Sequence, residues 1–91
     1  MIKKENRLIR LRPRAQHDLD ESTQRAAKVA EQIVKKLNLL YEFPLLGSAM
    51  DQAYEGYRQL LSGQYRIIYQ IVSDTEIEIA YIRHCSRQLE I

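Results

Sequence analysis

The sequence has few of the residues that define several classes of protein. Its single cysteine, Cys85, cannot form an internal disulfide, which excludes a disulfide-stabilised scaffold and favours a reducing cytoplasm. Its longest run without a charge, Phe43 to Met50, is far too short to span a bilayer. No apolar segment follows the first basic residues, as it would in a secretory signal.

The remaining composition is that of a small globular domain. Two prolines and three glycines, with 45% hydrophobic and 29% charged residues, exclude a collagen-like repeat and a disordered tail. A chain of 91 residues is long enough for one modest core. We therefore expect residues 1–91 to form a single domain that contacts no membrane.

Charge is unevenly distributed along the chain. Residues 1–14 carry six basic residues and one acidic residue, a net charge of +5, whereas residues 15–91 have a net charge of −3. Such a basic end can attract nucleic acid or an acidic protein. It is equally typical of an edge strand that charge protects against aggregation. The strand expected here covers residues 7–12 and ends at Pro13, which cannot donate to a sheet ladder.

From Arg14 to Phe43 the apolar residues are spaced as in a helix. Apolar or small side chains recur there every three or four residues and predict one buried stripe: Ala15, Leu19, Ser22, Ala26, Ala30, Ile33, Leu37 and Leu40. Pro44 should end the segment because a proline disfavours helical geometry in the residue before it.

This segment is long for one helix in a small domain. Asp20, Ser22 and Thr23 are all favourable N-caps. We therefore expect a short helix near residues 14–20, a tight turn and a second helix near 23–42, with one continuous helix as the alternative. The following segment, residues 45–55, has no clear period and is expected to be a loop.

The last third of the chain predicts a β-meander. Residues 57–61, 65–72 and 76–83 largely alternate and are rich in tyrosine and isoleucine, and polar turn residues separate them. The expected fold class is therefore α+β: an N-terminal strand, one or two helices (a helical hairpin), then a three-stranded antiparallel meander, with the helices on one face of the sheet.

Three cationic or titratable side chains are expected to meet on the open face of this meander. If both turns contain three residues, Arg66 lies between Leu60 and Ile82, and Arg58 and His84 become its diagonal neighbours. Arginine binds phosphate or carboxylate in a bidentate manner, and a histidine can donate a proton near neutral pH. The other interpretation is a solvated face on which Glu76 and Glu78 pair with the arginines.

Other catalytic chemistries have little support in the sequence. His84 and Cys85 are adjacent on a strand and point to opposite faces, which disfavours a nucleophile–base pair. His17 is the only other soft donor, and the three residues lack metal-ligand spacing. No phosphate-binding glycine loop is present. We therefore expect neither a metal nor a cofactor.

Four segments in the same order resemble the RelE/ParE superfamily of bacterial toxins. The central hairpin is the most specific of them, and the others resemble the strand-to-helix junction, the end of the helical segment and the last strand with its tail. In this sequence the segments are Leu11–Leu19, Leu40–Gly47, Gly56–Arg58 with Gly63–Tyr69, and Ile79–Arg87.

The resemblance implies a small cytoplasmic toxin that stops growth and is neutralised by an antitoxin. RelE-like members cleave mRNA at the ribosome, whereas ParE-like members inhibit DNA gyrase and are not nucleases. Here the Phe-Pro-x-x-Gly phrase and the His-x-x-Arg tail are closer to ParE, whereas the short segment before Pro44 is closer to RelE. Leu60 and Leu61 stand where a RelE-type nuclease would have further basic residues.

We interpret the chain as a gyrase inhibitor, with a metal-independent endoribonuclease as the first alternative and a non-toxic binding module as the second. The residues implied in target binding are Arg58, Arg66, His84 and Arg87. In the nuclease alternative, Arg58 and Arg66 would stabilise the charged intermediate and His84 would be the general acid. Arg10, Arg12 and Arg14 are expected to bind an acidic, partly disordered antitoxin segment.

Overall fold

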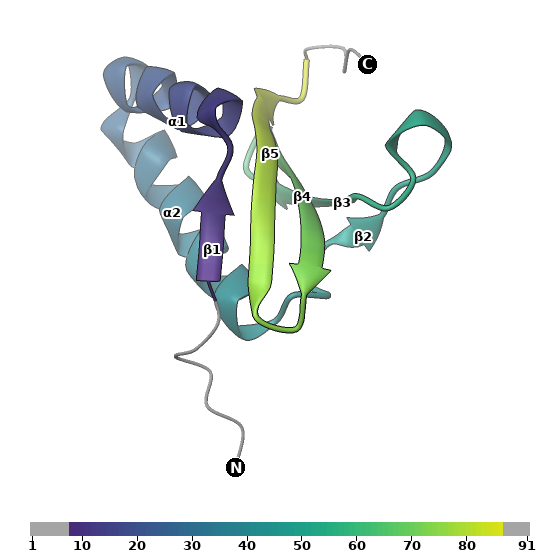
Figure 1. Cartoon of the computed structure of the whole chain (residues 1–91). Helices are drawn as coiled ribbons and strands as arrows, with labels where there is room; N and C mark the ends of the chain where they lie inside the picture. The colour runs from purple at the N-terminus through teal and green to yellow at the C-terminus, as the bar shows by residue number, and fades with distance from the viewer. Residues whose placement is uncertain (1–7, 87–91) are drawn as a thin grey trace.

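The computed structural model describes residues 8–86 and has two helices on one face of a five-stranded sheet (Figure 1). The sheet order is β1-β5-β4-β3-β2, in which β1 is parallel to β5 and the other neighbours are antiparallel. The expected α+β class is therefore confirmed. The elements are β1 (Leu8–Leu11), α1 (Pro13–Arg25), α2 (Ala27–Glu42), β2 (Ser48–Ala49), a 3-10 helix η2 (Gln52–Tyr54), β3 (Arg58–Ser62), β4 (Tyr65–Ser73) and β5 (Glu76–His84).

The helical segment is divided into two helices at Ala26, whose φ of −159° and ψ of 110° are those of extended backbone. Two helices were the preferred expectation, but the predicted turn was about four residues too early. Asp20, Ser22 and Thr23 lie inside α1 rather than at the start of a helix. No proline or glycine lies between residues 14 and 43, so local sequence gives no breaker that would fix the division.

The core lies between the helices and the sheet. The predicted stripe supplies Ala15 from α1 and Ile33, Leu37 and Leu40 from α2. These side chains pack against five buried residues of the sheet: Ile67, Tyr69, Ile77, Ile79 and Ile82. The helix ends before Pro44, as expected, and the amide of Phe43 donates to the carbonyl of Leu39.

The predicted loop over residues 45–55 contains regular structure. Ser48 and Ala49 form β2, which pairs with the start of β3, and η2 follows. A strand of two residues is too short to show alternation, which is why the sequence pattern did not indicate it.

The bounds of the three meander strands agree with the prediction to within about one residue. The assignment of side chains to the two faces of the sheet does not. The β3–β4 turn leaves only Gly63 and Gln64 unpaired, so Ser62 rather than Leu61 pairs with Tyr65. This shift of one residue moves every β3 side chain to the opposite face.

A bulge in β5 also changes which side chains face the helices, from Tyr81 to the end of the strand. Ile71 pairs with Ile77 as expected, and Tyr69 with Ile79, but Ile68 then pairs with Tyr81, so Ala80 is an extra residue. Ile82 consequently faces the helices and joins the core, although alternation had placed it on the open face.

Candidate functional site

Arg58 begins β3 on the face of the sheet that the core occupies, because it pairs with Tyr69. Its Nε and Nη2 both donate to the carbonyl of Gly47, at 2.9 and 2.6 Å, and Nη2 also reaches the carbonyl of Leu45 at 3.4 Å. The open-face position predicted for this arginine is therefore wrong. Its guanidinium holds the segment between α2 and β2 against the start of β3.

Tyr69 fixes the same segment from β4. Its hydroxyl donates to the carbonyl of Pro44 at 2.6 Å and accepts from the amide of Gly47 at 2.9 Å. A Cβ on Gly47 would lie 2.5 Å from the carbonyl oxygen of Gln59 and 2.8 Å from the Tyr69 ring, so only glycine fits. Pro44, Gly47, Arg58 and Tyr69 thus form one polar clamp, hereafter the Arg58 clamp, which sequence reasoning missed.

Arg66 lies on the opposite face of the sheet from Arg58. It pairs across the strands with Arg83, and its Nη2 donates to the carbonyl of Cys85 at 3.1 Å. Arg66 is thus on the open face, as predicted, but its cationic neighbour there is Arg83.

His84 ends β5 and pairs with Tyr65, whose ring it meets edge to face with centroids 5.2 Å apart. The amide of Ser86 donates to Nδ1 at 3.1 Å, and the Ser86 hydroxyl lies 2.6 Å from the same atom. Because Nδ1 accepts from a backbone N–H, the neutral ring must carry its proton on Nε2.

The three residues of the predicted cationic cluster do not converge. The short β3–β4 turn places Arg58 on the face opposite to Arg66. The bulge in β5 places His84 on that opposite face as well. Arg58 and His84 share a face, but their partners Tyr69 and Tyr65 are four positions apart on β4, about 13 Å at the usual rise per residue. Arg87 lies outside the described residues.

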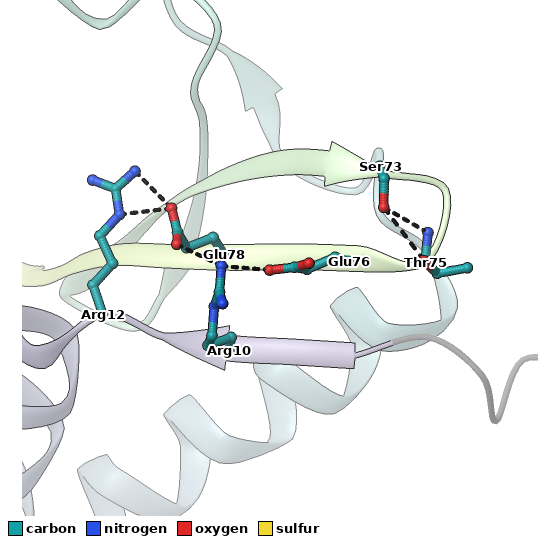
Figure 2. A network of polar contacts seen from close by, with 6 residues as sticks. All are labelled: Arg10, Arg12, Ser73, Thr75, Glu76 and Glu78. Atoms are coloured by element: carbon teal, nitrogen blue, oxygen red, sulfur yellow. Dashed lines mark hydrogen bonds and ion pairs between the residues drawn. The ribbon is translucent and has the colours of Figure 1, made fainter.

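The arginines predicted to bind an antitoxin are paired within the chain. Arg12 donates from Nε to Glu78 at 2.8 Å and from Nη2 to the Tyr57 hydroxyl at 3.0 Å, with its guanidinium 5.6 Å from the Tyr57 ring centroid. Arg10 pairs with both Glu76 and Glu78, as Figure 2 shows. The hydrogen bond from Arg12 lowers the pKa of Glu78, and the bond to Tyr57 raises the pKa of Arg12.

Asp18 is a buried carboxylate on α1 whose role the sequence did not reveal. Its Oδ2 accepts from the amide of Ile82 at 3.1 Å, beyond the point where β1 stops pairing with β5. Arg14 and Arg83 lie 3.5 and 3.8 Å from its two oxygens. Asp18 therefore continues the hydrogen bonding of the β5 edge and balances two guanidinium groups.

Between residues 8 and 86, no three histidine, cysteine, aspartate or glutamate side chains lie together as a metal site requires. No helix in this part of the chain is both long and apolar enough to cross a membrane.

Comparison with protein families identifies the chain. Residues 9–89 match the family described as the ParE toxin of a type II toxin–antitoxin system, parDE. The chain belongs to the ParE toxin family. It is therefore a toxin of a type II toxin–antitoxin system, as the resemblance implied. No curated protein matches it significantly.

Solved structures share the ParE toxin's fold at low identity. A RelBE2 toxin–antitoxin complex from Mycobacterium tuberculosis matches with a TM-score of 0.75 and 23% identity, over 86% of this chain and 96% of that one. A YoeB–YefM complex from Staphylococcus aureus gives 0.73 and 20%, over 86% and 95%. A chromosomal ParDE system from Pseudomonas aeruginosa gives 0.67 and 19%, over the same shares. Two of these three structures come from RelE-like and YoeB systems, so shared fold does not distinguish the mechanisms.

Proposed function

We propose that this ParE-family toxin inhibits DNA gyrase and does not cleave RNA. The separation of Arg58, Arg66 and His84 carries the proposal. Metal-independent RNA cleavage needs a cation at the phosphate and an acid at the leaving oxygen, both within hydrogen-bond reach of one substrate. Arg66 and His84 are on opposite faces of the sheet, and the Arg58 guanidinium is bound to the Gly47 carbonyl.

The match to the ParE family over residues 9–89 supports the same reading. RelBE2 and YoeB share the fold at 20–23% identity, which by itself favours neither mechanism. Arg66 on the open face remains our candidate for a contact with the target, and Arg87 remains a candidate from the sequence alone.

Two assays with the purified chain test the proposal. Gyrase, ATP and relaxed plasmid report supercoiling, and a translating extract reports ribosome-dependent mRNA cleavage. We expect supercoiling to fail while mRNA stays intact, and we expect the antitoxin to restore supercoiling. Cleaved mRNA with active gyrase would overturn the proposal in favour of the endoribonuclease. If a folded chain affects neither supercoiling nor mRNA, it is a non-toxic binding module.

A matched pair of variants sharpens this test. His84→Gln should leave gyrase inhibition within about twofold, because it keeps a hydrogen-bonding side chain and removes proton transfer, which gyrase inhibition does not require. Arg66→Ala should weaken inhibition by removing a charged contact on the open face. In a nuclease both changes would lower the cleavage rate, and losing a group that stabilises the charged intermediate costs about 10²–10³.

We also propose that the antitoxin binds near the N-terminal arginines. Arg10 and Arg14 are 56% and 52% exposed at the side chain, so an acidic segment could share them with the carboxylates they already contact. Neutralising both, as Arg10→Gln with Arg14→Gln, should weaken the complex and flatten its salt dependence. The control is Lys28→Gln, at an exposed lysine on α2. Equal affinity for the double variant at low salt would exclude the arginines from the interface.

A further inference from the structure

An open apolar hollow of about 430 Å³ lies between the two helices, and residues of both line it. Leu19 of α1 and Ala27, Ala30 and Val34 of α2 form its apolar lining. Val34 is 43% exposed, although it is a large aliphatic side chain. The volume is roughly three times that of a cavity of about 150 Å³ that holds benzene.

Opposite charges stand on the rim of this hollow. Glu31 and Lys35 are one helical turn apart on α2, and both are exposed. Neither makes an ion pair or a side-chain hydrogen bond with another residue between 8 and 86. Asp20, the third charge on the rim, accepts a hydrogen bond from Gln16. The hollow is therefore apolar at its base. On its rim, α2 carries one negative and one positive charge that no residue in the described part of the chain pairs.

We propose that this hollow is a contact between two copies of the chain, formed by antiparallel α2 helices about a two-fold axis. In such a contact the same patch serves both partners, so residue i meets j while j meets i. Glu31 of each copy then faces Lys35 of the other, and each Val34 enters the other hollow. The small Ala27 and Ala30 side chains allow the helix axes to approach to about 8–10 Å.

The charge pattern favours a second copy over an unrelated partner. A partner with one charged face would find an opposite charge at only one of the two unpaired rim residues, Glu31 and Lys35. An antiparallel copy satisfies both at once. One pair of short helices buries less than the roughly 1,200–2,000 Å² of a standard interface, so we expect a weak, reversible dimer.

Charge exchange tests this contact directly. Sedimentation equilibrium of the full chain, from micromolar to several hundred micromolar, should show a monomer–dimer equilibrium. Glu31→Lys and Lys35→Glu should each weaken it by at least about tenfold, since each replaces two attractive pairs with two repulsive ones. The double variant Glu31→Lys with Lys35→Glu should associate again. A mixture of the two single variants should form a heterodimer that neither forms alone.

A second pair of variants tests the apolar base of the hollow. Val34→Glu should abolish dimerisation, whereas Val72→Glu, at a valine that is 50% exposed on β4, should not. A chain that is monomeric at every concentration would overturn the proposal, as would a dimer that tolerates Glu31→Lys. If the unchanged chain is itself monomeric and Val34→Glu loses antitoxin binding, the hollow belongs to the antitoxin instead. The readout is molecular mass, so the result is independent of gyrase inhibition.

Discussion

Replacing Asp18 should destabilise the domain more than any exposed carboxylate, because α1 uses it to complete the sheet edge. Its Oδ2 accepts from the amide of Ile82 at 3.1 Å, and the residue is only 7% exposed. A hydrogen bond to a charged group contributes about 1.5–3 kcal/mol, and a buried amide left without a partner costs about 1–3 kcal/mol. We therefore expect Asp18→Ala to lower the free energy of unfolding by about 2–4 kcal/mol.

Asp18→Asn keeps an oxygen that can accept a hydrogen bond but removes the negative charge. The amide oxygen can still accept from Ile82, whereas the ion pairs with Arg14 and Arg83 are lost. The Arg14 pair is half exposed and contributes at most about 1 kcal/mol. The asparagine substitution should therefore cost roughly 1–2 kcal/mol, clearly less than the alanine substitution.

Thermal and urea unfolding, followed by circular dichroism, check both values. A loss of 2–4 kcal/mol corresponds to a fall in Tm of about 10–25 °C in a domain of this size. Asp20→Ala, two residues along the same helix and exposed, is the matched control and should stay within about 0.5 kcal/mol. If Asp18→Ala behaves like this control, the edge hydrogen bond contributes nothing. If the asparagine and alanine variants are equally unstable, charge balance rather than the acceptor is the cause.

Three further predictions concern the Arg58 clamp and the Arg12–Glu78 pair. Tyr69→Phe should destabilise the fold by about 1–3 kcal/mol in urea unfolding, because a buried ring stays in place while the Pro44 carbonyl and the Gly47 amide lose their partner. Gly47→Ala should cost at least about 1–3 kcal/mol through overpacking, with loss of soluble protein as the readout. Because the folded pKa of Glu78 is below its usual value, its pairing contributes fully above the unfolded pKa and is lost as pH falls through the folded pKa. Tm should therefore fall less below pH 4.5, the usual glutamate pKa, in Glu78→Gln than in the unchanged chain.

The order and type of the elements could be predicted from the sequence because each rests on a strong local pattern. Alternation located the three meander strands, and helical spacing located the buried side chains of α1 and α2. The division at Ala26 and the two-residue strand β2 have no such pattern. They depend on packing and on pairing with β3, which local sequence does not encode.

The faces of the sheet were harder to predict because side-chain direction has a period of two. One residue fewer in the β3–β4 turn reversed Arg58, and one extra residue at Ala80 reversed His84. Ala80 is 1% exposed and small, and nothing in its sequence neighbourhood distinguishes a bulge from regular strand. The predicted cluster therefore depended on the number of residues in the β3–β4 turn and on the extra residue in β5. Alternation alone gives neither.

The position of Arg58 explains why the ParE-like phrases are poor guides to mechanism. A guanidinium on the helix-facing side of a sheet needs acceptors, and the carbonyls of Gly47 and Leu45 supply them. The segment that carries those carbonyls is held in place by the Tyr69 hydroxyl, which binds Pro44 and Gly47. The Phe-Pro-x-x-Gly phrase and the central hairpin thus depend on each other, because each completes the hydrogen bonding of the other. A loss of toxicity on changing Arg58 consequently reports target binding only if the variant keeps the unfolding midpoint of the unchanged chain.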